Sequence, residues 1–384
     1  MREFTRRELL RAGVGGTTAA ILSACARALS DNLTLTPSAA GNRPTMTPAA
    51  SPASPPGSAE PNPPATTVPR LTREPANTPK PTYPPFEYVS DVAITPIEDF
   101  YAYTYHPQPP PTIADYRLRI IGQVKNELNL SLDDLLAMPS VEEMRTLECI
   151  SNPVGGKLIG NAVWRGVPMH HLLELAGVLS RAIELKFECA DGYHTSVPVE
   201  LAMDAHSFLA YWMNGVTLPP KHGYPLRALW PGRYGQKQPK WITAIELIVK
   251  PHLGHWEQQG WSNEAIIVPN SRIDQPKKLD VVQLPIMVSG IAFANRSGVA
   301  TVDVSTDDGR SWHEAELMRG PSSLAWTEWR HEWVAAEPGS YVLRARVTDG
   351  EGRTQRMGTN RLLGGSKPDG TDVQHTVAVT VKRS

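Results

Sequence analysis

Hydrophobic and polar positions alternate in short runs from about Phe86 onward, and these runs predict strands mixed with a few helices. Three runs predict strands: 116–124, 183–189 and 244–249. Two runs at helical spacing predict short helices: 131–138 and 167–176. Ser131 is a typical N-cap, and Gly177 is a typical residue just past a helix end. Mixed short strands and helices of this kind indicate an α+β domain over residues 86–272.

The pattern changes after residue 272, where strand-like runs follow one another without helices. Four alternating runs predict strands: 285–293, 299–305, 341–347 and 375–381. Asp307-Asp308-Gly309 and Asp349-Gly350 are turn sequences between such runs. Residues 273–384 are therefore predicted to form an all-β immunoglobulin-like sandwich. The cysteine pair of antibody domains is absent from this segment, so its apolar core alone must stabilise it.

Residues 26–85 have the composition of a disordered linker. Much of the chain's proline, 36 residues in all, is concentrated there with Ser, Thr and Ala, and large hydrophobic side chains are almost absent. Such a segment cannot bury enough apolar surface to offset the entropy cost of ordering it. We expect a semi-extended spacer with polyproline II character.

Residues 1–25 have the features of an export signal. Arg6-Arg7 predicts the twin-arginine type, and residues 12–26 carry no charge. This uncharged run is too short for a spanning helix. Leu22-Ser23-Ala24-Cys25 resembles a bacterial lipobox, in which Cys25 is lipidated and anchors the protein to a membrane; cleavage nearby without lipidation is the alternative. We therefore expect an exported protein, in the periplasm or on the outer face of the cell membrane.

Two of the three cysteines, Cys149 and Cys189, lie in the part of the chain that is predicted to fold. In an exported protein they could pair as a disulfide. The other interpretation is one reactive thiolate and one buried thiol. Cys189 ends an apolar strand and is typical of a core residue, whereas Cys149 lies where a strand runs into a Gly-rich turn. A thiolate favours soft or redox-active metals, but a single cysteine does not make a zinc site. Spacing alone leaves these alternatives open.

The sequence around Cys149 is part of a longer pattern. The matching segments, in chain order, are 146–152 (TLECISN), 160–167 (GNAVWRGV), 209–215 (LAYWMNG), 222–227 (HGYPLR), 231–235 (PGRYG), 240–241 (KW) and 302–312 (VDVSTDDGRSW). Together they resemble the sulfite oxidase-like molybdopterin oxidoreductases over roughly residues 90–384. A series of motifs kept in order over most of the chain is far more specific than any single motif.

The resemblance implies a molybdenum–molybdopterin cofactor, one per chain, with Cys149 as the single thiolate ligand of the metal. It implies two-electron oxygen-atom transfer as the activity, and a C-terminal dimerisation domain, so a homodimer is expected. The phosphate of the cofactor requires basic groups and backbone donors. By motif, the cofactor-binding candidates are Asn152, Tyr193, His222, Arg227, Gln238 and Lys240. The alternative for each is an ordinary turn or surface residue. This alternative is weakest for Arg227 and Lys240, because their neighbours in the sequence are apolar.

Several positive charges that sulfite oxidases place around sulfite are missing. Asn152 is followed by Pro153-Val154, where the family motif carries two arginines. Tyr103 maps to a further arginine, and Gly260-Trp261 maps to the family's catalytic Asp-Tyr pair. Losing these charges should weaken the binding of a dianion severely.

An aromatic pocket is expected in place of the arginines, with Tyr103 and Trp261 as catalytic candidates and with Tyr101 and Tyr105 beside them. For each of these aromatic residues taken singly, the alternative is that it packs in the core and does not line the pocket. The expected substrate is a small molecule other than free sulfite, such as a sulfoxide or another neutral organic S- or N-oxide.

The chain carries no Cys-x-x-Cys-His haem motif, iron–sulfur spacing or nucleotide-binding glycine motif, so a separate electron-transfer partner is expected, a cytochrome or a quinol protein. The formal net charge of −1 does not favour a nucleic-acid partner. Two alternatives remain from the sequence. One is a lipid-anchored, non-catalytic binding protein that retains the fold, and the other is a true sulfite oxidase or dehydrogenase.

Overall fold

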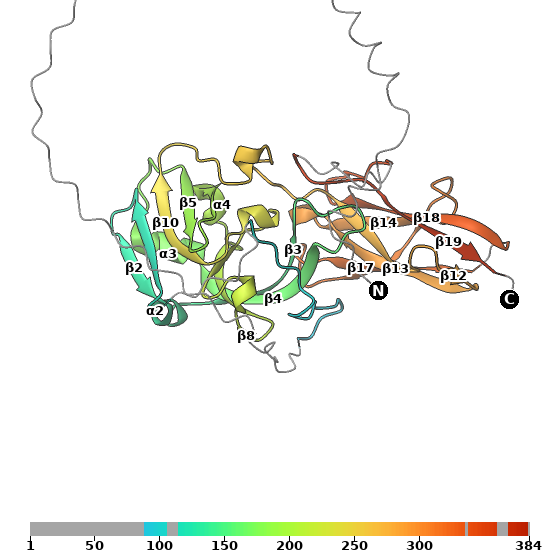
Figure 1. Cartoon of the computed structure of the whole chain (residues 1–384), viewed down its shortest axis with the longest axis horizontal. Coiled ribbons are helices and arrows are strands. Elements are labelled where there is room, and N and C mark those ends of the chain that lie inside the picture. Colours follow the sequence, from blue (N-terminus) through green and yellow to red (C-terminus); the bar gives the residue numbers. More distant parts are fainter. Residues whose placement is uncertain (1–87, 106–113, 335–336, 359–367, 383–384) are drawn as a thin grey trace, which may run out of the picture. The chain divides into compact units, whose positions relative to one another are not determined.

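Residues 88–105, 114–334, 337–358 and 368–382 are described by a computed structural model of the chain (Figure 1). They all belong to one compact unit, Thr67–Ser384, and the other unit, Met1–Thr66, lies outside the described residues. The predicted signal peptide, the predicted linker and Cys25 lie outside them too, and stay predictions. Within the described ranges, no helix combines the length and the apolar character needed to cross a membrane.

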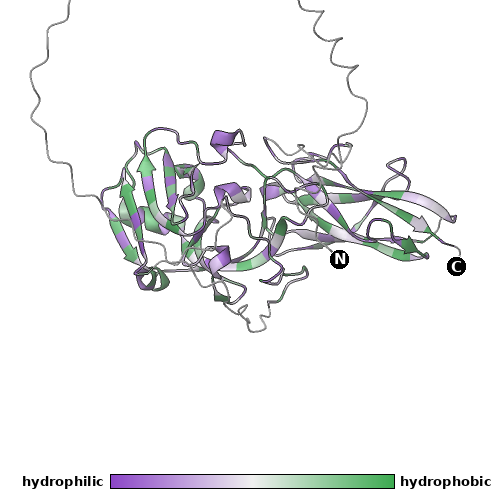
Figure 2. Ribbon diagram, viewed as in Figure 1, coloured by the Kyte–Doolittle hydropathy of each residue, from purple (hydrophilic) through white to green (hydrophobic). Residues whose placement is uncertain are grey.

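Five strands form the first sheet, in the order β2-β1-β10-β5-β6. Their bounds are β1 Arg117–Gly122, β2 Leu128–Ser131, β5 Glu184–Cys189, β6 His194–Pro198 and β10 Ile242–Ile248. β1 runs parallel to β10, and the other neighbours are antiparallel. Every second residue of β5 is buried, and Figure 2 shows polar and apolar positions alternating along the strands of this sheet. The three strands predicted for this half of the chain are confirmed.

The second sheet carries the motif around Cys149. Its strands are β3 Val141–Glu148, β4 Ile159–Pro168, β7 Phe208–Met213 and β8 Val216–Thr217, with β9 Arg227–Leu229 paired to β7. β3 and β4 are antiparallel from Val141↔Gly166 to Glu148↔Ile159, so residues 149–158 form the loop between them. The last five residues of β3 are all buried, which leaves Cys149 at the end of a strand that is covered on both faces.

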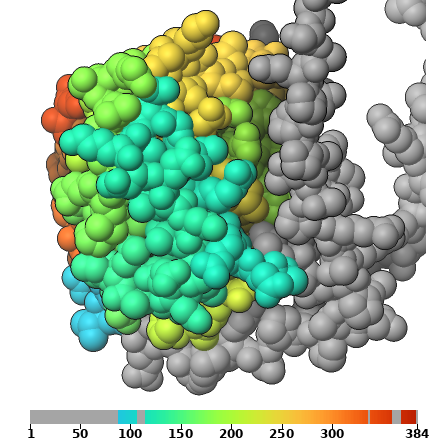
Figure 3. All heavy atoms as spheres, turned by 90° about the vertical axis from the view of Figure 1, so that its left-hand side faces the viewer, coloured from blue at the N-terminus to red at the C-terminus, as the bar shows by residue number. Residues whose placement is uncertain are grey.

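Helices are few and short. Both predicted helices are confirmed, as α2 Leu132–Leu136 and α3 Met169–Ala176, and α4 Val199–Ala202 adds a single turn. Ser131 caps α2 in a capping box with Asp134, and Gly177 ends α3 with a φ of 66°. The predicted α+β domain therefore consists mostly of strands. Residues of β1, β2 and α2 (teal) cover the centre of the face shown in Figure 3.

Two further sheets follow. One has the order β11-β13-β17-β16 and the other β12-β19-β18-β14-β15. The bounds are β11 Asn270–Gln275, β12 Val281–Val282, β13 Ile286–Phe293, β14 Val299–Ser305, β15 His313–Glu314, β16 Glu316–Arg319, β17 Thr327–Trp333, β18 Gly339–Asp349 and β19 His375–Val381. Val288 of β13 and Trp329 of β17 share one buried core with Val302 of β14 and Leu343 of β18, so these two sheets pack face to face. The four predicted strands are confirmed, and the immunoglobulin-like topology stays a prediction.

Candidate active site

One cavity of about 890 Å³, counted out to its open mouth, collects the predicted site residues. Eight of the nine line it: Tyr103, Cys149, Tyr193, His222, Arg227, Gln238, Lys240 and Trp261. They come from five separate stretches of the chain, and the fold alone brings them together.

Cys149 stands at the end of β3, with 9% of its surface exposed. Its backbone N–H donates to Leu158 O at 2.9 Å, which closes the loop towards β4. Its Sγ lies 3.1 Å from Ser151 Oγ, a cavity-lining residue that the sequence analysis missed although it is only two positions away. Burial raises the pKa of the Cys149 thiol above its usual value, and the hydrogen bond with Ser151 acts in the opposite direction.

The two described cysteines are both free and buried, so the structure contains no Cys149–Cys189 disulfide. Cys189 packs in the hydrophobic core beside β5, as predicted for a structural residue. Burial raises the pKa of its thiol well above the usual range. The two thiols face different spaces, because Cys149 lines the main cavity and Cys189 lines a separate hollow beside His194.

Asn152 was predicted to bind the cofactor, but it does not line this cavity. Its side-chain amide donates to Glu148 Oε1 at 2.9 Å, and its Oδ1 accepts from Leu158 N at 3.0 Å. Both ends of the amide are therefore used to shape the loop that carries Cys149. Asn152 lines a second, smaller hollow instead, together with Glu148 and Arg272.

Arg227 and Lys240 form the cationic part of the cavity. Arg227 Nη1 donates to His222 O at 3.1 Å, its guanidinium lies 4.9 Å above the Trp164 ring, and its Nε has no partner among the described residues. Lys240 Nζ donates to Lys221 O at 3.2 Å and lies 4.2 Å from the centre of the Trp241 ring. Burial lowers the pKa of Arg227 to about 10. Burial and the nearby Arg227 charge lower the pKa of Lys240 to about 7. Two cations held together out of water favour an anionic ligand.

His222, which was predicted to bind the cofactor, is neutral in the folded protein. Burial, then the charge of Arg227, lowers its pKa to about 3. Its Nε2 lies 3.2 Å from Ile97 O, and because a carbonyl only accepts, Nε2 carries the proton. Gly223, with a φ of 122°, follows directly, and a Cβ there would stand 3.1 Å from the Cβ atoms of both Arg227 and Lys240. A glycine at this turn therefore lets the two cationic side chains approach.

Amide groups of the loop after β9 form another wall of the cavity. Gln238 Nε2 donates to Arg233 O at 2.6 Å, and Gln236 Nε2 donates to Ser262 O at 2.7 Å. The Oε1 atom of each is buried without a partner among the described residues. Tyr193 supports this loop, because its Oη donates to Gln236 O at 2.5 Å. The sequence did not single out Gln236 as a cofactor-binding residue. The one feature that could have indicated it is its position two residues before Gln238.

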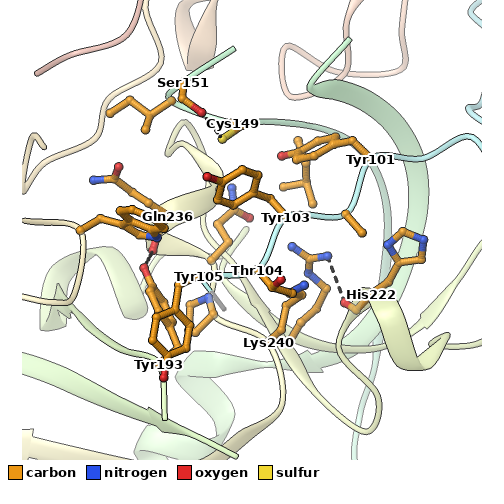
Figure 4. A pocket seen from close by; sticks show the side chains of 18 of the residues that line it. Tyr101, Tyr103, Thr104, Tyr105, Cys149, Ser151, Tyr193, His222, Gln236 and Lys240 are labelled. Atoms are coloured by element: carbon orange, nitrogen blue, oxygen red, sulfur yellow. Dashed lines mark hydrogen bonds between the residues drawn. The ribbon is translucent and has the colours of Figure 1, made fainter. Parts of the chain in front are cut away.

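The surroundings of Cys149 are aromatic. Tyr101, Tyr103 and Trp261 line the same cavity as the thiol, and Figure 4 shows Tyr101, Tyr103 and Ser151 grouped near Cys149, with Lys240 farther off. Tyr103 is 49% exposed, which excludes the alternative that it is a core residue. Its ring centre lies 6.0 Å from that of Trp256, another lining residue that the sequence analysis did not single out.

The C-terminal half braces the strand that carries Cys149. Thr146 N donates to Leu324 O at 2.9 Å, and Trp326 N donates to Thr146 Oγ1 at 2.8 Å. Glu148 Oε2 accepts from Asn270 Nδ2 at 2.7 Å. These contacts join segments more than a hundred residues apart, so a local sequence pattern does not predict them.

The loop after Cys149 rests on the same half of the chain. Arg272 Nη1 donates to Gly156 O at 3.0 Å. Gly155 has a φ of 70°, and a Cβ on it would stand 2.2 Å from His375 Nε2. The His375 ring is itself held, because its Nδ1 accepts from Ile273 N at 3.0 Å. The Gly-rich sequence of this loop is therefore a packing requirement.

Comparison with known proteins agrees with this architecture. Residues 106–256 match the family described as the oxidoreductase molybdopterin binding domain. Mitochondrial sulfite oxidase of Rattus norvegicus is 30% identical over 295 residues, which cover 64% of this chain and 54% of that protein. A protein of Azospira oryzae, provisionally named protein-methionine-sulfoxide reductase subunit YedZ1, is 34% identical over 149 residues, covering 39% of this chain and 55% of its own. The chain spans about half the length of the curated relatives it matches.

Among solved structures, the sulfane dehydrogenase SoxCD from Paracoccus pantotrophus has the same fold, with a TM-score of 0.57. The identity is 24%, and the match covers 71% of this chain and 81% of that one. Nitrate reductase [NADH] 2 of Phaseolus vulgaris is 29% identical over 282 residues, covering 58% of this chain and 32% of that protein. The sequence relatives thus include more than one kind of molybdenum oxidoreductase.

The residues in the cavity fit a molybdopterin cofactor. Arg227 Nε is a buried donor that lacks an acceptor among the described residues, as a phosphate would supply. The Oε1 atoms of Gln236 and Gln238 are buried acceptors that lack donors there, as the N–H groups of a pterin would supply. Cys149 offers one soft ligand at the opposite end from Lys240. The chain therefore contains an oxidoreductase molybdopterin binding domain, is similar to sulfite oxidases, and has a cavity that suits the molybdenum–molybdopterin cofactor which such a domain implies.

Proposed function

We propose that this protein reduces a neutral sulfoxide, or a related organic S- or N-oxide, and does not act on free sulfite. The observation that carries the proposal is the aromatic surrounding of Cys149, in a cavity whose lining cations are Arg227 and Lys240. Tyr101, Tyr103 and Trp261 line the cavity there, while the cation Lys240 lies apart from the thiol. A sulfite dianion needs several charge-assisted hydrogen bonds where it reacts, whereas a neutral oxide needs a close-fitting apolar wall and a single donor.

Each part of the site has a role in this reaction. When bound, molybdenum–molybdopterin supplies a two-electron redox centre. Cys149 would hold the metal as a thiolate and would therefore give up its proton when the cofactor binds. Arg227 and Lys240 bind the phosphate, and Gln236 and Gln238 accept N–H groups of the pterin.

The net reaction takes one sulfoxide, two electrons and two protons to one thioether and one water. The electrons come from a separate reducing partner, a cytochrome or a quinol protein. The aromatic side chains around Cys149 hold the organic part of the substrate and keep water away from it. The Azospira oryzae relative, named for protein methionine sulfoxide, supports a sulfur oxide as the substrate class.

The remaining expectations are part of the same proposal. The Arg6-Arg7 signal exports the protein, and lipidation of Cys25 anchors it outside the cytoplasm, with the Pro-rich segment as a spacer. Residues 273–384 form an immunoglobulin-like domain through which two copies pair. Globomycin treatment and palmitate labelling of the wild type and of Cys25→Ala test the anchor, and light scattering of the purified protein tests the dimer.

Metal analysis and two steady-state assays decide the function. We expect one molybdenum per chain, turnover of methyl p-tolyl sulfoxide with reduced viologen as donor, and no appreciable sulfite oxidation with ferricyanide as acceptor. Efficient sulfite oxidation would establish the alternative of a true sulfite oxidase, which the relatives 30% identical to this chain favour. Purified protein without molybdenum or pterin would establish the non-catalytic binding protein.

A further inference from the structure

Tyr101 presents an unused hydroxyl group to the cavity beside Cys149. Its residue lines the cavity, and Figure 4 shows the hydroxyl directed towards Cys149. Two other tyrosines around this site use their hydroxyls within the protein: Tyr105 donates to Asp191 O at 2.7 Å, and Tyr193 donates to Gln236 O at 2.5 Å. The Tyr101 hydroxyl makes no hydrogen bond with the described residues. Because the hydroxyl opens into the cavity, an acceptor on a bound molecule can take the place of water there.

The Tyr101 ring is held in place from one side by packing. It stacks on Phe100, with ring centres 5.6 Å apart and 14° between the planes. Phe100 is 2% exposed and meets Trp164 and His222 edge to face, at 5.6 Å and 5.5 Å. A Cβ on Gly160 would stand 2.8 Å from the Phe100 ring, so this glycine makes room for the stack.

Gly235 limits the Tyr101 hydroxyl from the other side. A Cβ on Gly235 would stand 3.1 Å from Tyr101 Oη, closer than ordinary van der Waals contact. The hydroxyl therefore sits in a slot that one added methyl group would disturb. Tyr103, by contrast, is 49% exposed at the mouth, and nothing comparable fixes it. A donor with a fixed position costs no reorganisation when its acceptor arrives.

We propose that Tyr101 is a catalytic residue that donates its phenolic O–H to the oxygen atom of the substrate as that atom is held on the cavity side of Cys149. The inference rests on the proposed function and adds the group that recognises the oxygen. The phenol donates a hydrogen bond and keeps its proton, because burial raises the pKa of Tyr101 well above its usual value. One neutral donor suits the oxygen of a sulfoxide or N-oxide, which carries a partial negative charge.

Tyr101→Phe tests the hydroxyl alone, because the ring and its stacking remain. We expect unchanged molybdenum and pterin content, an unchanged melting temperature, and a kcat/KM for methyl p-tolyl sulfoxide lowered by about 10- to 100-fold. Tyr341→Phe removes a hydroxyl that donates to Glu337 O and does not line the cavity, so this control should stay within about threefold of the wild type. Gly235→Ala keeps the hydroxyl but displaces it, and should lower kcat/KM at least severalfold with molybdenum retained.

A second readout does not depend on turnover. Pulsed EPR of the Mo(V) state in H2O and D2O detects exchangeable protons near the metal, and Tyr101→Phe should remove a coupling that Tyr341→Phe retains. Wild-type kcat/KM and an unchanged coupling in Tyr101→Phe would overturn the inference, and so would loss of molybdenum in this variant, which would indicate a structural role. If the wild type oxidises sulfite instead, the proposed function fails, while the same pair of variants assayed with sulfite still decides whether the hydroxyl contributes. Protein that binds no molybdenum overturns both.

Discussion

Glu148 Oε2 accepts a hydrogen bond of 2.7 Å from Asn270 Nδ2, which joins the last residue of β3 to the first residue of β11. The other carboxylate oxygen accepts from Asn152 Nδ2 at 2.9 Å. Cys149 follows Glu148 directly, so the position of the thiol depends on a contact between the two halves of the chain. The C-terminal sheets therefore help to shape the candidate active site as well as forming a core of their own.

Glu148→Gln should weaken the contacts of Glu148 with Asn270 and Asn152. Both asparagines donate to the carboxylate, and a glutamine would present an N–H group to one of these two donors. Asn152 cannot reverse its amide to compensate, since its Oδ1 already accepts from Leu158 N. We expect a loss of ~1–3 kcal/mol in the free energy of unfolding, measured by urea denaturation, together with a lower molybdenum content. Glu316→Gln, which alters an exposed pair with Arg330, is the control and should leave the urea midpoint unchanged. Equal effects of the two variants would contradict the assigned brace.

Cys149→Ser should abolish turnover and lower the molybdenum content, because the metal loses its protein thiolate. Cys189→Ala removes a core thiol away from the main cavity, so it should keep its molybdenum and lose only stability. Inductively coupled plasma mass spectrometry on both purified variants measures the difference. Full molybdenum in Cys149→Ser, or a comparable loss in Cys189→Ala, would contradict the assignment.

Lys240 should give the cofactor-free protein a pH-dependent stability. Its pKa is about 7 in the fold and 10.5 when unperturbed, so between these values the unfolded chain holds a proton that the folded chain has lost. Stability from this group therefore rises as the pH rises from 7 to 10.5. Cofactor-free Lys240→Met, which has no such proton, should be more stable than the wild type near neutral pH, and this advantage should shrink as the pH approaches 10.5. Urea midpoints at several pH values measure the gap, and a constant or widening gap would count against the buried cation.

Gly155→Ala should destabilise the loop after Cys149 for two reasons. Gly155 has a φ of 70°, and the new Cβ would meet the held His375 ring. Gly352→Ala is the matched control, because Gly352 has a φ of 83° and no atom lies within 4 Å of the place that a new Cβ would take. We expect ~1 kcal/mol for the control, from backbone strain alone, and a larger loss with reduced molybdenum for Gly155→Ala. Thermal melting of the two variants compares them, and equal shifts would show that the His375 contact is unimportant.

The sequence by itself determined the local structure and the chemistry of the central residue. Alternation of apolar positions predicts β5, and the capping residues Ser131 and Gly177 predict where two helices begin and end, because these signals act within a few neighbouring residues. The order of motifs around Cys149 also pointed to the cofactor before any contact was known. The predicted cation pair Arg227 and Lys240 lies in the cavity that Cys149 lines.

Only the tertiary structure decided how these parts are used. Asn152 belongs to the same motif as Cys149 but turns away from the cavity, while Gln236 and Tyr101 enter it. The brace from Asn270 to Glu148 joins residues 122 positions apart. Periodicity along the chain reports which face of a strand is buried, but not which distant strand covers it. Which strands lie against each other depends on the packing of whole sheets. This packing places the aromatic side chains beside Cys149 and makes glycine necessary at the positions that they press against.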